Sequence, residues 1–183
     1  MNTRKYFIFI GFWVAIILFL SHEGWTQPKP GTHAPIITHA YAIDGGQYGS
    51  ILKLYIEADD PDGDILRIAK VVDQVGYGLY QTDWTYVKPQ NRHHLIGYLQ
   101  WNTFSSKVST INDWTRITIR VSIFDKAGNE SNEVVFPFTF ETRTGSEPKP
   151  PAPFDQGNIQ RLGHIMIDLV GRDGDNDAKI WPD

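Results

Sequence analysis

The feature of this chain that most constrains its fold is a hydrophobic pattern with a period of two residues. Two runs carry it, and their apolar positions are Leu52, Leu54, Ile56 and Ala58 in the first and Ile117, Ile119, Val121 and Ile123 in the second. Successive side chains of a β-strand point to opposite faces of a sheet, so each run places one set of side chains in a core and the other in solvent. Both runs are therefore predicted to be strands. The side chains expected to be buried together are Leu54, Ile56, Ile119 and Val121, with Lys53 and Arg120 on the solvent side.

Five further segments carry the same period more weakly. "DILRIAKVV" (64–72) places Leu66, Ile68 and Val72 on one face, and "NEVVFPFTFE" (132–141) turns its phenylalanines to one side. Pro137 lies in the second of these segments, and because proline cannot donate to a ladder we expect a sheet edge or a bulge there. The remaining three segments are "PIITHAYAI" (35–43), "DWTYV" (83–87) and "HHLIGYLQW" (93–101). About seven short strands without a helical segment predict an all-β fold, an antiparallel sandwich.

Two passages of the sequence resemble a known superfamily. "SILKLYIEADDPDGDILRIAKVV" (50–72) resembles the second-to-third strand passage of bacterial immunoglobulin-like, fibronectin type III-like and cadherin-like domains. "TRITIRVSIFDKAGNESNEVVFPFTF" (115–140) is similar to the final hairpin of the same domains. The resemblance implies an immunoglobulin-like sandwich of about seven strands. It implies no single function, since such sandwiches serve in adhesion, spacing, ligand binding and assembly.

Proline-containing segments mark the limits of the expected sandwich. One is "WTQPKPGTHA" (25–34) and the other is "TGSEPKPPAPFDQGN" (144–158). The predicted organisation is a signal peptide or signal anchor at 1–24, a linker at 25–33, the sandwich at 34–142, a Pro-rich linker at 143–161, and a C-terminal strand with an acidic tail at 162–183. Within the last part, "LGHIMIDLV" (162–170) is too apolar for a free tail. It is expected to pack as an added strand on the sandwich or on a partner.

The N-terminus has the residue order of an export signal. Arg4 and Lys5 precede an apolar run from Tyr6 to Leu20, and polar residues follow. A helix of this length spans about 22 Å, which is shorter than a hydrocarbon core of about 30 Å, so cleavage is favoured. No good cleavage site follows the run, which leaves an uncleaved signal anchor as the alternative. In both cases the protein is expected to be exported, to the periplasm, the cell surface or the exterior.

Charge and cysteine content exclude several classes of protein. The formal net charge is −4 and the sequence contains no cysteine. Nucleic-acid binding requires a clustered basic surface, and the sequence contains no long run of lysine and arginine residues that would indicate one. Disulfides and zinc thiolate sites require cysteine. Membrane contact is expected only through the N-terminal segment, if that segment is not cleaved.

The acidic stretch "EADDPDGDI" (57–65) has two interpretations. Asp60, Pro61 and Gly63 occupy the positions that a type I turn prefers, and turn chemistry alone explains them. Calcium binding is the alternative, because one loop could supply several of the six to eight oxygens that Ca²⁺ takes. The candidate ligands are Glu57, Asp60, Asp62 and Asp64. No other cofactor is expected.

Aromatic residues also have two interpretations. Trp101 and Trp114 lie close to apolar strands and are expected in the core. The segment "GYGLYQTDWTY" (76–86) has glycine and polar neighbours, which favour a loop or an edge. Its aromatic residues are Tyr77, Tyr80, Trp84 and Tyr86. They could stack on a sugar ring or anchor a protein partner, or they could pack at the edge of the sandwich.

No motif in the sequence carries a catalytic mechanism. It contains no G-x-S-x-G or H-E-x-x-H pattern, and the adjacent His93 and His94 point to opposite faces of a strand. We therefore predict a protein that is not an enzyme but an exported sandwich module for adhesion, spacing or protein–protein assembly at the cell envelope. Its partner would be a protein or a cell-surface component. A carbohydrate- or ligand-binding accessory domain that uses segment 76–86 is the alternative.

Overall fold

The computed structural model describes residues 33–106, 111, 113–142 and 148–171 of the 183-residue chain. The chain divides into two units, Met1–Pro30 and Gly31–Asp183, and all described residues belong to the second. The predicted signal or anchor at 1–24 and the acidic tail at 172–183 lie outside the described residues. Within the described ranges, no helix combines the length and apolar character needed to cross a membrane.

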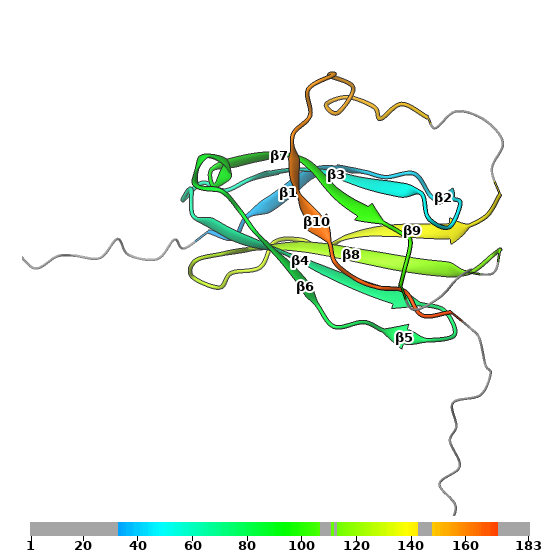
Figure 1. Ribbon diagram of the computed structural model, residues 1–183. Helices are drawn as coiled ribbons and strands as arrows, with labels where there is room; N and C mark the ends of the chain where they lie inside the picture. The colour runs from blue at the N-terminus through cyan, green and yellow to red at the C-terminus, as the bar shows by residue number, and fades with distance from the viewer. Residues whose placement is uncertain (1–32, 107–110, 112, 143–147, 172–183) are drawn as a thin grey trace, which may run out of the picture. The chain divides into compact units, whose positions relative to one another are not determined.

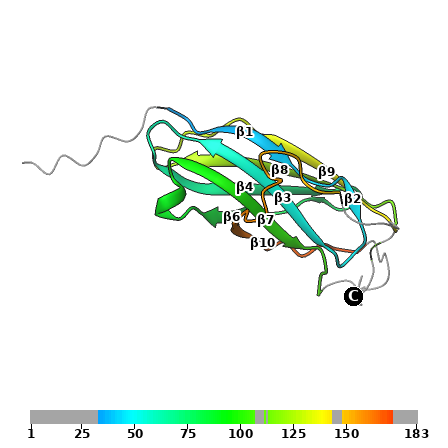
Figure 2. The same ribbon diagram turned by 90° about the horizontal axis from the view of Figure 1, so that it is seen from above.

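The described chain folds into two packed β-sheets (Figures 1 and 2). The strands are β1 (Ile36–Tyr41), β2 (Gly45–Gly46), β3 (Ile51–Asp59), β4 (Ile65–Gln74), β5 (Gly78–Leu79), β6 (Asp83–Tyr86), β7 (His94–Asn102), β8 (Arg116–Asp125), β9 (Val134–Phe140) and β10 (Arg161–Ile165), with a 3₁₀ turn at Pro89–Asn91. One sheet has the order β1-β3-β7-β10. The other has the order β2-β9-β8-β4-β5, and β6 also pairs with β4.

The prediction of an all-β sandwich is confirmed. The four side chains predicted to be buried together, Leu54, Ile56, Ile119 and Val121, are each 0% exposed, whereas Lys53 is exposed and Arg120 is half-buried. The orders β1-β3-β7 and β9-β8-β4 correspond to strands ABE and GFC of an immunoglobulin-like sandwich. The expectation that all pairs are antiparallel was wrong at two places, because β10 runs parallel to β7 and β2 runs parallel to β9.

Strand β4 has a bulge near its start that changes which side chains face the core. The pairing register with β8 shifts between Ile65 and Arg67. A bulge adds one residue to one strand and re-aims the side chains beside it. Ile65 is therefore fully buried in the place predicted for Leu66, which is half-buried. Beyond the bulge the alternation buries Ile68 and Val72 as predicted, and it also buries Lys70 at 0% exposure.

Strand β9 lies near the edge of its sheet, in agreement with the position of Pro137. Among the described strands, only the two-residue strand β2 pairs with it on the side away from β8, at Thr139 and Phe140. Pro137 is exposed and stands opposite Thr118 of β8, while Phe136 and Phe138 point into the core. A proline is tolerated here because no described strand takes a hydrogen bond from its outer side.

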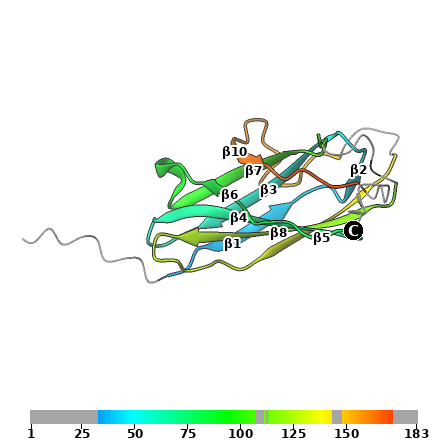
Figure 3. The same ribbon diagram turned by 60° about the horizontal axis from the view of Figure 1, so that its bottom comes forward.

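The segment expected as a C-terminal strand packs on the sandwich and closes its open side. We refer to residues 161–171 as the C-terminal clasp. It begins with β10, which lies between β7 of one sheet and β6 of the other (Figures 1 and 3). Its inward side chains Ile165, Ile167 and Leu169 are buried, and the indole N–H of Trp101 donates to the carbonyl oxygen of Ile167 at 3.0 Å. The clasp therefore joins the hydrophobic core rather than lying on its surface.

The chain that leads to the clasp is anchored as well. Phe154 is 3% exposed, and its ring lies 5.5 Å from that of Tyr55 on the outer face of the first sheet. Tyr55 in turn contacts Tyr41 and Tyr98, with ring centroids 6.2 and 5.6 Å away. Residues 148–160, expected to be part of a linker, thus carry one aromatic anchor on the sandwich. This anchor limits the paths by which the chain can reach β10.

Candidate functional site

The acidic loop between β3 and β4 is organised by one buried carboxylate. Asp60 is 1% exposed, and its two carboxylate oxygens accept hydrogen bonds from the backbone N–H groups of Asp62 and Asp64 at 3.0 and 3.1 Å. Its carbonyl oxygen accepts from the N–H of Gly63, which has φ of 69°. Aspartate side chains stabilise turns in this way, and glycine tolerates positive φ. The arrangement has the geometry of a turn closed by Asp60.

Two of the other three candidate calcium ligands, Glu57 and Asp62, contact different partners. The carboxylate of Glu57 lies on the outer face of the first sheet, 2.8 Å from Nδ1 of His39 and 3.5 Å from Nε2 of His94. Asp62 accepts a hydrogen bond at 2.7 Å from the backbone N–H of His33. Among the described residues, no group of three or more His, Asp or Glu side chains is placed to hold a metal ion. The structure does not bring Glu57, Asp60, Asp62 and Asp64 together around one point.

Two of the four aromatic residues in segment 76–86 are engaged in packing. The phenol oxygen of Tyr80 accepts from the backbone N–H of Val170 at 2.8 Å and donates to the side-chain oxygen of Gln74. Burial raises the pKa of Tyr80, an effect that the hydrogen bond with Val170 opposes and the neighbouring Tyr77 reinforces. Trp84 packs edge-on against Phe124, with the guanidinium of Arg67 4.0 Å from its ring centroid. Tyr80 and Trp84 thus support the fold.

The other two aromatic residues of this segment are exposed but lie apart. Tyr86 is 68% exposed and projects from β6 on the same face as Trp84, since alternate residues of a strand share a face. Tyr77 is 53% exposed in the turn between β4 and β5, where its ring stacks on that of Tyr80 at 4.7 Å. The four residues therefore do not form one aromatic platform, since Tyr77 lines one hollow in the surface and Tyr80 lines another.

Trp114 corrects the prediction for the second core tryptophan. Trp101 is 0% exposed as expected, but Trp114 is 74% exposed and has a φ of 69°. Among the described residues it is the only one other than glycine with positive φ. Its N–H donates to the carbonyl oxygen of Phe140 at 2.6 Å, which holds this backbone conformation at the start of β8. Asn112 and Asp113, which precede Trp114, are residues that favour turns and were the available sequence signal.

Two hollows meet at Trp114. The first has a volume of about 350 Å³ and is lined by Gln74, Tyr77, Arg116 and the end of the clasp at Val170 and Gly171. The second has a volume of about 530 Å³ and is lined by Asp44, Arg116, Thr139 and Glu141. Trp114 and Arg116 line both. The two volumes lie in the range of small-molecule sites, about 300 to 1,000 Å³.

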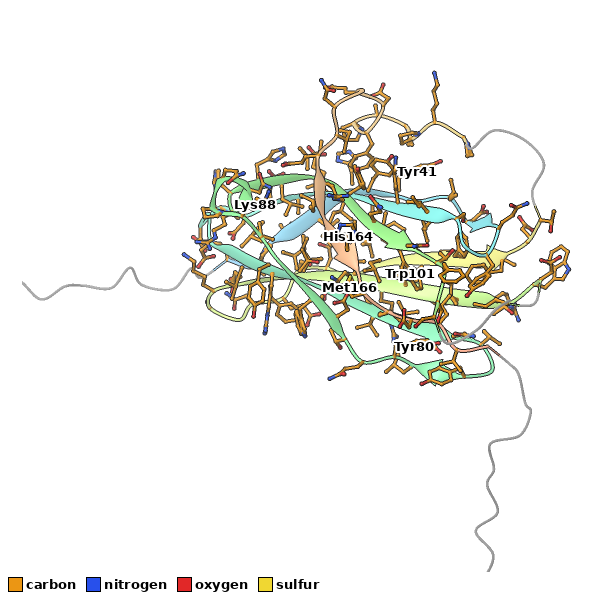
Figure 4. The ribbon with its side chains drawn as sticks, viewed as in Figure 1. Tyr41, Tyr80, Lys88, Trp101, His164 and Met166 are labelled. Atoms are coloured by element: carbon orange, nitrogen blue, oxygen red, sulfur yellow. The ribbon has the colours of Figure 1, made fainter. Side chains whose placement is uncertain are left out.

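A buried charge pair joins the clasp to the second sheet. Nζ of Lys70 lies 3.0 Å from the carboxylate of Asp83, and it donates to the hydroxyl of Thr85 at 2.6 Å and to the carbonyl of His164 at 3.1 Å. Asp83 also accepts from the backbone N–H of Met166 at 2.8 Å. Figure 4 shows His164, Met166 and Tyr80 along the path of the clasp. Burial lowers the pKa of Lys70, and the hydrogen bond and charge of Asp83 oppose that effect.

Sequence reasoning did not identify Lys70 as a buried residue, although a signal was present. Lys70 stands between Ile68 and Val72 in the alternating run, on the face that points to the core. A lysine is almost never fully buried unless it is paired. Its partner Asp83 lies directly opposite on β6, and this cross-strand pairing could not be read from the sequence.

No protein-family model matches the chain, and no curated protein matches it. Among solved structures, it is similar to the CARDB domain of a Pyrococcus furiosus protein in complex with di-metal ions. The identity is 10%, the match covers 63% of this chain and 96% of that one, and the TM-score is 0.33. At these values the likeness supports no statement about metal, ligand or activity.

Proposed function

We propose that the protein is a non-catalytic, exported β-sandwich module for spacing, adhesion or protein–protein assembly at the cell envelope. The observation that carries this proposal is the path of the chain through the sandwich. The chain enters at the blue start of β1 and leaves at the red end of the clasp, at opposite ends of the sandwich in Figures 1 and 3. A module with this path can be joined in series with whatever precedes and follows it.

Contacts at the two ends support this description of the path. His33 contacts Asp62, just before β4 begins, and the carbonyl oxygen of Val170 accepts from the side chain of Gln74, the last residue of β4. β4 has 10 residues. At about 3.3 Å per residue, entry and exit are separated by about 33 Å along this strand. Tension applied between the two ends would act along the sheets and on the clasp.

The roles of the buried ionisable groups favour a non-catalytic module. Among the described residues, Lys70 and Tyr80 have shifted pKa values, and both bind the backbone of the clasp. Asp60 closes a turn, and Asp125 does the same by accepting from the N–H of Asn129 at 2.8 Å. General acid–base catalysis requires such groups to converge on a substrate in a cleft. In the described part of the chain these four groups serve the fold.

Export is proposed on the basis of the N-terminal sequence, and a thiol-labelling experiment tests it. The absence of cysteine allows one reporter thiol to be placed at Ala127→Cys, an exposed position in the turn after β8. In cells that produce the full chain, a maleimide that cannot cross the inner membrane should label this thiol. A matched chain with the apolar residues 6–20 deleted should be labelled only after lysis. Equal protection of both chains in intact cells would contradict export.

A module joined in series with its neighbours is expected to resist force applied between its two ends. When the full chain is held by its two ends in a force spectroscopy experiment, the clasp should resist force until the sandwich unfolds as one unit. A low-force event that releases about 30 residues before the sandwich unfolds would contradict the proposed load path.

Ligand binding is a second candidate function, favoured by the exposure of Trp114 and Tyr77 beside the two hollows.

A further inference from the structure

The left-handed backbone conformation of Trp114 is strained, and burial of its side chain does not compensate for the strain. A left-handed conformation costs a residue with a side chain about 1–2 kcal/mol relative to glycine, and bulky residues are rare there. Strain of this kind persists where the surrounding structure imposes it and is concentrated at functional sites. Trp114 offsets none of this cost by burial, because it is 74% exposed. An exposed indole held in a strained conformation points to a role in contact with something outside the chain.

Around this indole the structure gathers the groups that a sugar requires. A pyranose ring offers an apolar C–H face, which stacks on an aromatic ring, and hydroxyl groups, which both donate and accept hydrogen bonds. Trp114 and Tyr77 supply two exposed aromatic rings at the first hollow. Arg116 supplies donors, and Asp113 of the first hollow supplies carboxylate acceptors.

The charged groups around the two hollows disfavour an acidic ligand. Arg116 lines both hollows, and its guanidinium has no hydrogen bond or ion pair with another described residue. Carboxylates outnumber it, because Asp113 lines the first hollow and Asp44 and Glu141 line the second. The charge of these side chains taken together is negative, so an acidic ligand would be repelled. A neutral, hydroxyl-rich ligand meets no such repulsion, which favours a neutral saccharide.

We propose that the two hollows beside Trp114 form one binding site for a neutral oligosaccharide. The indole stands between the hollows, so sugar units in both can be part of one chain. Tyr77 stacks the unit in the first hollow, and Arg116 donates to hydroxyls in either. This site goes beyond the module role proposed above, and it replaces segment 76–86 as the location of a carbohydrate site, since only Tyr77 of that segment takes part.

The C-terminal clasp holds the first hollow in shape. Val170 and Gly171 form part of its wall, and the carbonyl oxygen of Val170 accepts from the side chain of Gln74 at 2.7 Å. The phenol oxygen of Tyr80 accepts from the N–H of Val170, and its ring stacks on that of Tyr77 with the ring centroids 4.7 Å apart. A site whose parts are already held in place loses less conformational entropy on binding.

The test is a titration of the full chain with three neutral hexasaccharides, cellohexaose, chitohexaose and maltohexaose, by isothermal calorimetry. At least one should bind saturably in the micromolar to millimolar range. Trp114→Gly should weaken that binding about tenfold or more, as expected for loss of an aromatic anchor. Tyr77→Ala should weaken it several-fold. The matched control Tyr86→Ala removes another exposed tyrosine, from β6, and should leave the affinity unchanged.

Thermal melting of the same variants separates a binding role from a structural one. Glycine accepts positive φ without strain, so Trp114→Gly should leave the melting temperature unchanged or raise it by a few degrees. Trp101→Ala, which empties a buried position, should lower it strongly. Saturable binding lost in Trp114→Gly without loss of stability supports the site. Absence of binding to all three sugars, unchanged affinity in Trp114→Gly, or a melting loss like that of Trp101→Ala would overturn it. None of these results depends on export, so the site and the module role can fail separately.

Discussion

The ammonium group of Lys70 donates a hydrogen bond to the carbonyl oxygen of His164 at 3.1 Å, although 94 residues separate the two in the sequence. This contact joins β4 of one sheet to β10 of the other. With the indole of Trp101 bound to Ile167 and Tyr80 bound to Val170, it makes the clasp a structural part of the sandwich. The C-terminal clasp thus completes the fold and shapes the candidate binding site.

Removing one member of the Lys70–Asp83 pair should cost more than removing the other. Asp83→Ala leaves a fully buried ammonium group without its counter-charge and leaves the N–H of Met166 without an acceptor. The expected loss is about 3–5 kcal/mol. Lys70→Met keeps a side chain of similar length and removes the fully buried charge, and the Asp83 that remains is 17% exposed and still accepts from the N–H of Met166, so its loss should be smaller. Urea denaturation measures both. Equal losses would show that the ammonium is not buried as described.

The alkaline pH dependence of stability should separate Lys70 from Tyr80. Burial lowers the pKa of Lys70 below its ordinary value of 10.5. Between the lowered pKa and 10.5 the unfolded chain binds more protons than the folded chain, so this residue makes stability rise with pH. Burial raises the pKa of Tyr80 above its ordinary value of 10.0. Above that pH the unfolded chain loses the phenol proton first, so this residue makes stability fall as pH rises.

Two variants isolate these opposing trends. Lys70→Met should abolish the rise and leave the fall, and Tyr80→Phe should do the reverse. Free energies of unfolding from urea titrations at several pH values between about 8 and 11 report both slopes. Parallel pH profiles for wild type and both variants would contradict the assignment.

A single methyl group on β7 should displace the clasp. A Cβ at Gly97 would lie 2.5 Å from Cγ of Leu162 and 2.7 Å from the carbonyl oxygen of Gln160. Gly97→Ala should therefore destabilise the protein by about 1–3 kcal/mol and expose residues 161–171 to protease. Gly157→Ala is the matched control, because a Cβ there meets nothing within 4 Å. Limited proteolysis followed by mass spectrometry detects the difference, and equal resistance of the two variants would refute the close packing.

Removal of calcium should leave stability unchanged. Asp60 has its carboxylate bound to the backbone of its own turn, and Glu57 faces two histidines on the first sheet. We therefore expect the same melting temperature in EDTA and in millimolar calcium. Asp62→Asn should cost little, whereas Asp60→Ala should cost about 1–3 kcal/mol by leaving buried N–H groups without an acceptor. A bound ion at a hundredfold excess over Kd would add about 2.7 kcal/mol, or about 5–10 °C. A calcium-dependent rise of that size, lost in Asp62→Asn, would establish a site in this loop.

Much of the sandwich could be predicted because its strands are buried on one face only. Because side chains alternate along a strand, the period of two places Leu54 and Ile119 on the inward face. Pro137 has no backbone N–H to donate, which predicts an edge position. These are local properties of a strand. The bulge that buries Ile65 in the place predicted for Leu66 arises from the pairing of β4 with β8. The sequence of one strand gives no indication of it.

The candidate binding site depends on contacts between distant residues, which pattern reasoning does not provide. Trp114 was expected in the core because tryptophan is usually well buried, but the backbone at the start of β8 turns it outward. Tyr77 could be selected as an exposed aromatic residue. Its neighbours in space, Val170 and Arg116, come from the clasp and from β8. The parallel pairing of β10 with β7 likewise follows from the route that the chain takes after β9.

A disulfide tests the position of the clasp most directly, because the native chain contains no cysteine. A Cβ at position 163 would lie 3.2 Å from the Cβ of Thr85, close to the separation of about 3.5–4.5 Å in a disulfide. The double variant Thr85→Cys/Gly163→Cys should oxidise to a bond within one chain, identified by mass spectrometry of the non-reduced tryptic digest. Thr85→Cys/Gly157→Cys serves as the control and should keep free thiols. If the pair at 85 and 163 also keeps free thiols, or links only between chains, the clasp does not close its own sandwich.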